Sequence, residues 1–273
     1  MNDDHGWILC GDGPAAYEKH IVPAFSGAWA EDMVKRAALR NGERVLDLAC
    51  GTGIVSRHAL QFLGTSGAVT GVDVNAAVLE KAREICPPDA APVEWKQADA
   101  AALPFSDAVF DVALCQQGLQ YFPDRSRALK EIKRILVPGG RIVFSVWRSI
   151  DYSPFYQALH HALARYVSPE AAEMLSSAYA LSDADELKAL FTSAGFKRIE
   201  LSIVIKQMRC PSLKEFLGGG FAASPFAEEI SALPEAKHEK LLQMVRNAVV
   251  DYIDDKGLAA PMESHLISAR KQR

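Results

Sequence analysis

The chain has 273 residues, of which 49% are apolar and 23% are charged. This composition predicts a globular protein with a sizeable core and excludes a disordered chain. The formal net charge of −4 disfavours a nucleic-acid-binding protein, because such proteins usually carry a basic stripe. We interpret the two short basic runs, at 130–134 and 270–273, as a solvated helix face and a frayed tail.

The five cysteines are odd in number, scattered and without CxxC spacing. They indicate a reducing compartment and argue against a disulfide framework or a metal site. The first residues are acidic and lack the basic start and apolar run of a signal peptide. No apolar stretch reaches the roughly 18 residues that a membrane span requires. We therefore expect a cytoplasmic protein without a membrane span.

The first half of the chain alternates strands and helices. A helix is predicted first, over about 23–39. Strands follow at 44–48, 68–72, 93–97, 109–115 and 141–147, with helices at 54–63, 76–86 and 125–136 between them. This alternation is typical of βαβ units and predicts a parallel sheet covered on both faces.

The second half is mainly helical. Helices are predicted at 154–165, 169–179, 183–194, 213–226 and 235–252, with strands at 199–208 and 262–270. Because we find no flexible linker, we expect residues 1–273 to form a single domain. Its core would comprise about 41–150, 182–209 and 258–273. Insertions at about 151–181 and 210–257 would form a helical cap over the ligand-binding edge of the sheet.

The segment 45–53 runs from a strand through a glycine turn into a helix. Gly51 and Gly53 permit positive φ angles and let a ligand lie against bare backbone. The helix that follows presents free N–H groups, which suit a carboxylate or phosphate. A tight turn without a ligand is the alternative, since glycine often marks turns.

Acidic residues follow the next two strands. Asp73 ends the second strand about 20 residues after the turn, where a carboxylate can accept hydrogen bonds from both ribose hydroxyls. Asp99 follows the third strand, where it could accept a hydrogen bond from an adenine amino group. Taken singly, Asp73 could instead be the hydrogen-bonding partner of a helix N-terminus, and Asp99 could belong to an ordinary polar loop. Together with the glycine turn, they predict a nucleoside-containing cofactor.

Two Rossmann-type cofactors fit this outline. A dinucleotide prefers a third glycine where this chain has Ser56. The turn also begins with Asp47, which dinucleotide sites do not require. An NAD(P)-dependent oxidoreductase is therefore the alternative to S-adenosylmethionine (SAM) binding, and the absence of a Tyr-x-x-x-Lys pair counts against it.

These motifs resemble those of class I SAM-dependent methyltransferases of the type 11 group, which includes ubiquinone and menaquinone C-methyltransferases. The matching segments are 47–53, 71–75, 97–105, 110–117 and 131–140. The resemblance is specific over about 44–147 and looser elsewhere. It implies a Rossmann-like α/β fold, with a seven-stranded, mostly parallel sheet, a reversed last strand and a helical cap.

The resemblance also implies which residues bind the cofactor, with S-adenosylhomocysteine as the product. The expected cofactor-binding residues are Tyr17, Asp47, Ala49, Gly51, Thr52, Gly53, Asp73, Val74, Asp99, Ala100, Ala101, Cys115 and Gln116. Asp73 would hold the ribose and Tyr17 would close over the cofactor.

The methyl acceptor is expected to be a small molecule under the cap, since such pockets are mostly apolar. Gln117, Gln120 and Tyr121 are the substrate-facing candidates, after a fourth strand that lacks an Asn/Asp-Pro-Pro-Tyr/Phe motif. No catalytic residue is identified. Candidates for a general base are His160, His161, Tyr121, Tyr152 and Tyr156, if the reaction needs one. No metal is expected.

Three further alternatives stay open at this point. The chain could bind SAM without catalysis, because methyl transfer need leave no catalytic residue to find. It could methylate protein or RNA, although a cap disfavours bulky targets. The chain could also form a homodimer, and no nucleic acid is expected as a partner.

Overall fold

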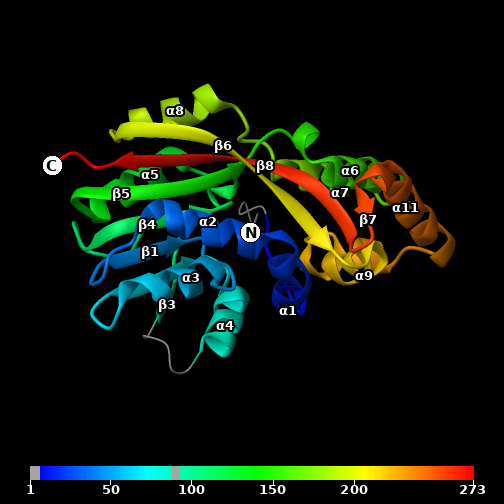
Figure 1. The fold of residues 1–273 in the computed structure, drawn as a ribbon, viewed down its shortest axis with the longest axis horizontal. Coiled ribbons are helices and arrows are strands. Elements are labelled where there is room, and N and C mark those ends of the chain that lie inside the picture. Colours follow the sequence, from blue (N-terminus) through cyan, green and yellow to red (C-terminus); the bar gives the residue numbers. More distant parts are fainter. Residues whose placement is uncertain (1–6, 88–92) are drawn as a thin grey trace.

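A computed structural model describes residues 7–87 and 93–273. Its centre is a twisted sheet in the order β3-β2-β1-β4-β5-β8-β6 (Figure 1). The strands are β1 (Arg44–Leu48), β2 (Ala68–Asp73), β3 (Val93–Gln97), β4 (Phe110–Gln116), β5 (Leu136–Trp147), β6 (Lys197–Cys210), β7 (Ile253–Asp254) and β8 (Gly257–Arg270). Neighbouring strands from β3 to β5 are parallel, and β8 runs antiparallel to β5 and β6. The predicted fold class is confirmed, and the short β7 adds a hairpin to β8.

Helices cover both faces of this sheet. The helices α2 (Gly27–Ala37) and α3 (Ile54–Leu63) share one buried cluster, while α5 (Arg125–Ile135) and α8 (Ala184–Ser193) belong to a second. The helix α4 (Ala76–Ile85) lies along β2 and β3. The strands between the helices are apolar without alternation, as expected for strands buried on both faces.

The cap consists of α6 (Pro154–Tyr166), α7 (Pro169–Ser177), α9 (Leu213–Gly220), α10 (Ala227–Ser231) and α11 (Glu235–Ala248). Short 3-10 turns lie at Leu119–Tyr121, Ile150–Tyr152, Phe221–Ala223 and Val250–Tyr252. The cap and one face of the sheet share a single apolar cluster, which includes Trp29 of α2, Phe155 of α6 and Phe216 of α9. The division into a core and two cap insertions stays a prediction.

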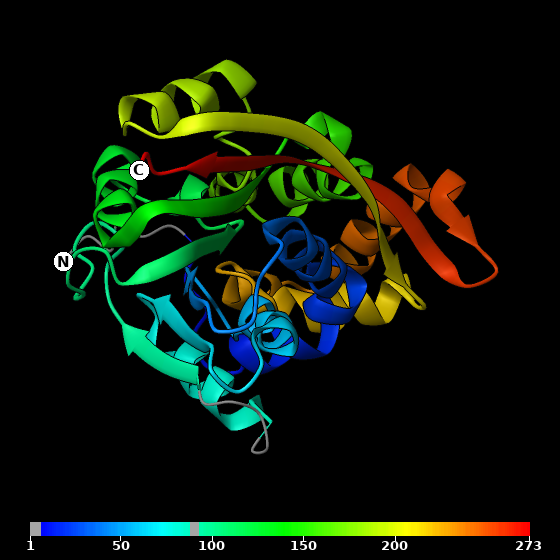
Figure 2. The ribbon, with the colours of Figure 1, turned by 60° about the vertical axis from the view of Figure 1, so that its left-hand side comes forward.

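The strands β6 and β8 are longer than the sequence predicts. They continue side by side beyond the other strands, so that the end of β6 and the start of β8 lie beside α9 and β7 (Figures 1 and 2). Residues 257–261 include Gly, Ala and Pro, which are poor strand formers, so local preference does not reveal them as a strand. Continuous pairing with β6, from Gln207 opposite Pro261 to Cys210 opposite Leu258, overrides that preference.

The first helix begins earlier than the sequence predicts. The segments α1 (Gly13–Ala16), η1 (Tyr17–Ser26) and α2 follow one another, and η1 is a π-helix. Pro23 therefore lies inside a helix rather than at its start. A proline lacks the N–H that an α-helix needs, and the wider π turn accommodates it, with Gly27 N donating to Val22 O.

The basic tail is also more ordered than expected. The backbone of Lys271 exchanges hydrogen bonds with Gly139 and Gly140, and its Nζ donates to Leu136 O at 2.7 Å. The tail therefore continues the sheet rather than fraying. In the described part of the chain, no helix combines the length and apolarity needed to cross a membrane.

Candidate active site

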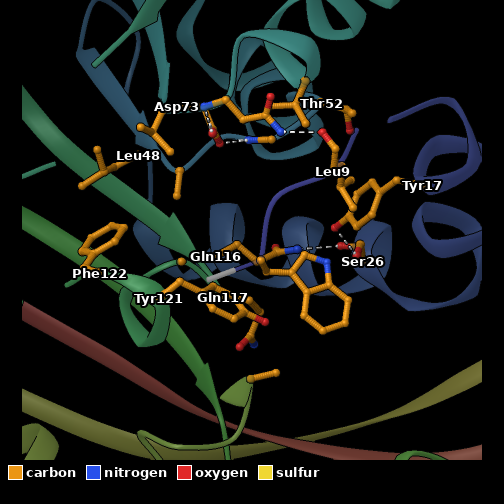
Figure 3. A pocket seen from close by; sticks show the side chains of 18 of the residues that line it. Leu9, Tyr17, Ser26, Leu48, Thr52, Asp73, Gln116, Gln117, Tyr121 and Phe122 are labelled. Carbon is orange, nitrogen blue, oxygen red and sulfur yellow. Dashed lines mark hydrogen bonds between the residues drawn. The ribbon is translucent and has the colours of Figure 1, made fainter. Parts of the chain in front are cut away.

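A cavity lies at the carboxyl edge of β1, β2 and β4 and continues under the cap (Figure 3). The carboxyl edge of a parallel sheet is where ligands bind in open α/β folds. One half of the cavity adjoins the glycine turn after β1, and the other half is lined by aromatic and aliphatic side chains of β5, β8 and the cap. We describe the two as the glycine-turn half and the apolar half.

Glycine is required at the turn itself and beneath it. Gly51 and Gly53 have φ angles of +52° and +84°, which residues with a Cβ rarely adopt. A Cβ at Gly53 or at Gly71 of β2 would also overlap the ring of Trp95. The turn therefore rests on β2 and β3 through this indole ring, which fixes its backbone against the cavity.

The carboxylate of Asp73 is held by the backbone. Its Oδ2 accepts a hydrogen bond from Gly51 N and its Oδ1 accepts one from Asn75 N, both at 2.9 Å (Figure 3). Burial raises the pKa of this carboxyl, and the two backbone hydrogen bonds oppose the shift. Each carboxylate oxygen keeps further lone-pair capacity, so Asp73 can still accept hydrogen bonds from a ligand.

Asp47 lies behind the turn. It is 1% exposed, and its Oδ2 accepts hydrogen bonds from Ser56 N at 2.9 Å and Ser56 Oγ at 2.7 Å. Burial raises its pKa to about 7, against the lowering effect of these two hydrogen bonds. Its Oδ1 is buried and has no hydrogen-bond partner among the described residues. Asp47 thus fastens the turn to the start of α3 without lining the cavity.

The N-terminal helix is fastened across the glycine turn. Arg57 of α3 forms an ion pair with Glu18 of η1, at 2.9 Å, and donates to Thr52 O at 2.6 Å. Beside Glu18, the hydroxyl of Tyr17 lies 2.8 Å from Ser26 Oγ (Figure 3). Burial raises the pKa of Tyr17, so its phenol stays protonated at neutral pH. The helix therefore brings Tyr17 to the cavity wall.

The end of β4 contributes two glutamines. Gln116 Nε2 donates to Ser26 O at 3.1 Å, and Gln117 Nε2 lies 2.9 Å from Ser264 Oγ of β8. The backbone φ of Gln117 is +56°, and Ala49 at the end of β1 has a φ of +53°. Such conformations in residues other than glycine are strained and are common at functional sites.

The apolar half is built mainly from aromatic rings. Trp147 at the end of β5 contacts Phe25 edge to face, with ring centroids 6.0 Å apart, and lies 6.5 Å from Tyr179. Tyr156 of α6 contacts Phe25 in the same way, at 6.1 Å. Burial raises the pKa values of Tyr156 and Tyr179 well above their ordinary range. Both phenols are therefore neutral hydrogen-bonding groups at physiological pH.

Most of the expected site residues line this cavity. They are Tyr17, Ala49, Gly51, Thr52, Asp73, Val74, Asp99, Ala100, Gln116, Gln117, Tyr121 and Tyr156. Asp47, Gly53, Ala101, Cys115 and Gln120 lie outside the lining. Cys115 is fully buried in β4, where its side chain faces the sheet core, and Gly53 faces Trp95. For these five residues the structure shows no contact with the cavity.

The structure does not bring His160 or His161 to the cavity. The ring Nδ1 of His160 faces α7, at 3.1 Å from Ala172 O and 2.8 Å from Ser176 Oγ, and His161 is exposed. Tyr152 is also exposed, under the guanidinium of Arg148. None of these three candidates for a general base lines the cavity. The expectation is corrected because the two histidines face α7 and solvent, and Tyr152 lies in an exposed 3-10 turn.

Several residues that line the cavity were not predicted from the sequence as site residues. They are Trp7, Leu9, Phe25, Trp147, Leu175, Ala178, Tyr179 and Met262. Trp147 ends a predicted strand at the carboxyl edge of the sheet, so its position was a usable signal. The residues of the cap and the N-terminal segment carried no such signal, because only the tertiary fold brings them to the edge.

The polar groups of the glycine-turn half fit SAM. Thr52 Oγ1 and Gln116 Oε1 are buried beside the cavity without a hydrogen-bond partner among the described residues, so they can meet the polar end of a ligand. The Asp73 carboxylate suits ribose hydroxyls. Val74, Ala98 and Ala100 supply an apolar surface between β2 and β3. Within residues 7–87 and 93–273, no group of three or more metal-ligand side chains occurs.

Comparisons with known proteins agree with this fit. The chain is 33% identical over 197 residues to a demethylmenaquinone methyltransferase of Staphylococcus carnosus, covering 68% of this chain and 78% of that protein. It is 34% identical over 185 residues to a 2-phytyl-1,4-naphtoquinone methyltransferase of Synechococcus elongatus, covering 62% and 78% of the two chains. No support emerges for the oxidoreductase alternative.

A solved structure shows the same fold at lower identity. Phosphoethanolamine N-methyltransferase 2 of Haemonchus contortus, in complex with SAM, matches with a TM-score of 0.61 and 21% identity. The match covers 96% of this chain and 57% of the other. The model of the ubiE/COQ5 methyltransferase family matches residues 24–205, which include β1 to β5, the glycine turn and Asp73. The chain therefore belongs to the ubiE/COQ5 methyltransferase family and is a SAM-dependent methyltransferase.

Proposed function

We propose that this methyltransferase modifies a small, largely apolar aromatic molecule, with a naphthoquinone-type ring in its reduced, hydroquinone form as the first acceptor to test. The observation that carries the proposal is the continuation of the cavity beyond the glycine turn into the apolar half. Aromatic walls of this kind suit a flat ring. The two relatives described above are named for naphthoquinone compounds, which supports this choice.

In this proposal the glycine-turn half holds SAM. Asp73 accepts hydrogen bonds from the ribose, while Val74, Asp99 and Ala100 surround the adenine. Gly51, Thr52 and Gln116 meet the methionine part. Asp73 and Gly51 already bind each other, at 2.9 Å, so the site is preorganised and little ordering is needed when the cofactor binds.

Bound SAM supplies an activated sulfonium methyl group, so the protein mainly positions the acceptor and excludes water. Trp7 contributes to this exclusion. Its indole contacts Tyr121 after β4 and Phe226 of the cap, with ring centroids 6.3 and 5.9 Å apart. The N-terminal segment thus bridges the core and the cap over the cavity.

The described lining of the apolar half offers no carboxylate, histidine or amine that could act as a base. The phenols of Tyr121, Tyr156 and Tyr179 keep their protons at neutral pH because burial raises their pKa values. They can therefore donate hydrogen bonds to an acceptor oxygen and orient the ring. An acceptor that already carries a nucleophilic carbon, oxygen or nitrogen suits such a lining.

Methyl transfer from isotope-labelled SAM tests the proposal. Naphthohydroquinones, phenols and aryl amines are offered in parallel with total protein and total RNA, and labelled products are identified by mass spectrometry. We expect label in one class of aromatic small molecule, and none with an Asp73→Ala variant. Label that appears only in protein or RNA contradicts the proposal.

A further inference from the structure

Gln117 occupies a constrained position at the junction of the two halves. Its φ of +56° is uncommon for a residue with a Cβ, and its backbone N–H donates to Ser145 O of β5 at 3.0 Å. The side chain lines the cavity beside Tyr121 (Figure 3). A strained backbone held in this way directs one side chain to one place.

The hydrogen bonds of Ser264 determine which end of the Gln117 amide faces it. Ser264 is fully buried in β8, and its hydroxyl donates its single proton to Val146 O at 2.7 Å. A backbone carbonyl can only accept, so this direction is fixed. At 2.9 Å from the Gln117 amide, Ser264 Oγ must therefore accept, and the amide must present Nε2 to it.

The amide oxygen of Gln117 is consequently left to face other groups. Gln120 Nε2 is its one protein donor among the described residues, at a long 3.4 Å. A carbonyl oxygen has two lone pairs, so Gln117 Oε1 retains capacity for a second hydrogen bond. The junction therefore offers an acceptor atom.

The orientation of the Gln116 amide follows from its hydrogen-bond partner in the same way. Its contact at 3.1 Å is Ser26 O, which can only accept, so the amide presents Nε2 there. Its Oε1 is buried without a partner among the described residues. In both of these adjacent amides Nε2 donates to a fixed protein acceptor, and Oε1 keeps hydrogen-bonding capacity.

We propose that Ser264 is a positioning residue that fixes the Gln117 amide, so that Oε1 accepts a hydrogen bond from an O–H or N–H group of the methyl acceptor. This inference rests on the proposed methylation of a small molecule. It makes the site selective for acceptors that carry a donor beside the methylated atom, because an acceptor without one leaves Gln117 Oε1 without its second partner.

The test has one arm that does not depend on activity. Side-chain amides are labelled with 15N-glutamine, and the Gln117 resonances are assigned by their loss in Gln117→Asn. We expect Ser264→Ala to shift and broaden the Gln117 amide resonances while leaving those of Gln116 in place. Ser268→Ala, which removes a hydroxyl from the same strand, serves as the matched control and should leave both unchanged.

The second arm measures selectivity, as the ratio of kcat/KM for 1,2-dihydroxynaphthalene to that for 2-methoxy-1-naphthol, which keeps one hydroxyl for methylation but lacks the second O–H beside it. We expect a ratio of about 10 or more in the wild type and about 3 or less in Ser264→Ala, with an S-adenosylhomocysteine Kd unchanged within about twofold. Ser264→Thr, which keeps the hydroxyl, should retain the wild-type ratio. Ser264→Ala should add nothing in a Gln117→Ala background.

An unchanged ratio together with unchanged Gln117 resonances in folded Ser264→Ala overturns the inference. A different result distinguishes the failure of the proposed function. If the wild type binds S-adenosylhomocysteine but methylates neither of the two naphthalene derivatives nor any other aromatic compound, the proposed acceptor class is wrong. The amide resonances then still decide whether Ser264 fixes Gln117.

Discussion

The two halves of the cavity are built from different parts of the chain. The glycine-turn half comes mainly from the ends of three successive strands, within residues 48–100. The apolar half joins Phe25 near the start, Trp147 in the middle and Met262 in β8. The glycine-turn half is therefore specified by local sequence, and the apolar half by the tertiary fold.

Their chemistry differs in the same way. The glycine-turn half fixes its polar groups by short-range hydrogen bonds, such as those of Asp73 to Gly51 and Asn75. The apolar half has neutral phenols and hydrocarbon surfaces that can adapt to ligands of different outline. This difference suggests that cofactor binding and acceptor binding can be altered separately, which the following variants test.

The largest expected effect is that of Asp47→Asn on the free energy of unfolding, measured on the protein without bound cofactor. The pKa of Asp47 rises from 3.8 in the unfolded chain to about 7 in the fold, so the wild type loses stability as pH rises from about 4 to about 7. Asp47→Asn carries no charge to bury. It should raise the free energy of unfolding by up to roughly 4 kcal/mol at pH 8, and by less at pH 5.

Urea unfolding of both proteins at the two pH values measures this difference. Asp185→Asn, on the exposed face of α8, is the control and should show no pH-dependent gain. A stability difference that is the same at pH 5 and pH 8 would show that burial of the Asp47 charge is not its cause.

Next in size is the effect of Asp73→Asn on cofactor affinity. The amide cannot accept hydrogen bonds at both positions, so one contact to the backbone or to the ribose is lost along with the charge. We expect S-adenosylhomocysteine to bind about 100-fold more weakly, or about 2.7 kcal/mol. Calorimetry measures the Kd, and the exposed Asp251→Asn serves as the control. A change in Kd below about fivefold would show that Asp73 does not bind the cofactor.

Ala178→Leu should affect the other half alone. Ala178 is 6% exposed and lines the apolar half, so a larger side chain reduces the space for an acceptor. We expect kcat/KM for the acceptor to fall about tenfold, or about 1.4 kcal/mol, with the cofactor Kd unchanged. The neighbouring Ala180 is exposed, and Ala180→Leu should behave like the wild type. Equal losses in both Kd and kcat/KM would mean that the halves are not separable.

The smallest effect is expected for Glu18→Gln. The variant removes the charge that pairs with Arg57, and each side chain of this pair is 18% exposed. A loss of about 1 kcal/mol in local stability is expected, with cofactor affinity reduced about threefold. Hydrogen exchange should be faster within residues 13–26. Lys35→Gln, which breaks the exposed pair with Glu31, should leave this exchange unchanged.

Sequence alone predicted the half that depends on local patterns. The order of strands, the turn at Gly51 and the carboxylate of Asp73 followed from apolar periodicity and from glycine and aspartate at strand ends. These signals sit within single βα units, where chain neighbours are also neighbours in space.

The remaining features depend on contacts between residues far apart in the chain. Helical periodicity placed His160 and His161 on a helix but did not show that α7 lies beside His160. The pairing of Ser264 with Gln117 joins residues 147 positions apart. The sequence likewise does not predict the π-helical segment around Pro23, because a proline is typical of the first turn of a helix.

The central position of β8 has a consequence for the order in which the protein is completed during synthesis. Among the described strands, β6 pairs with the sheet only through β8, which is translated some 50 residues later. At the usual translation rate of about 5–20 residues per second, β6 and the open edge of β5 remain unpaired for several seconds before β8 is made. The five parallel strands and the glycine turn are available earlier. A nascent chain can thus gain its nucleoside site on the ribosome before the wall that receives the second substrate exists.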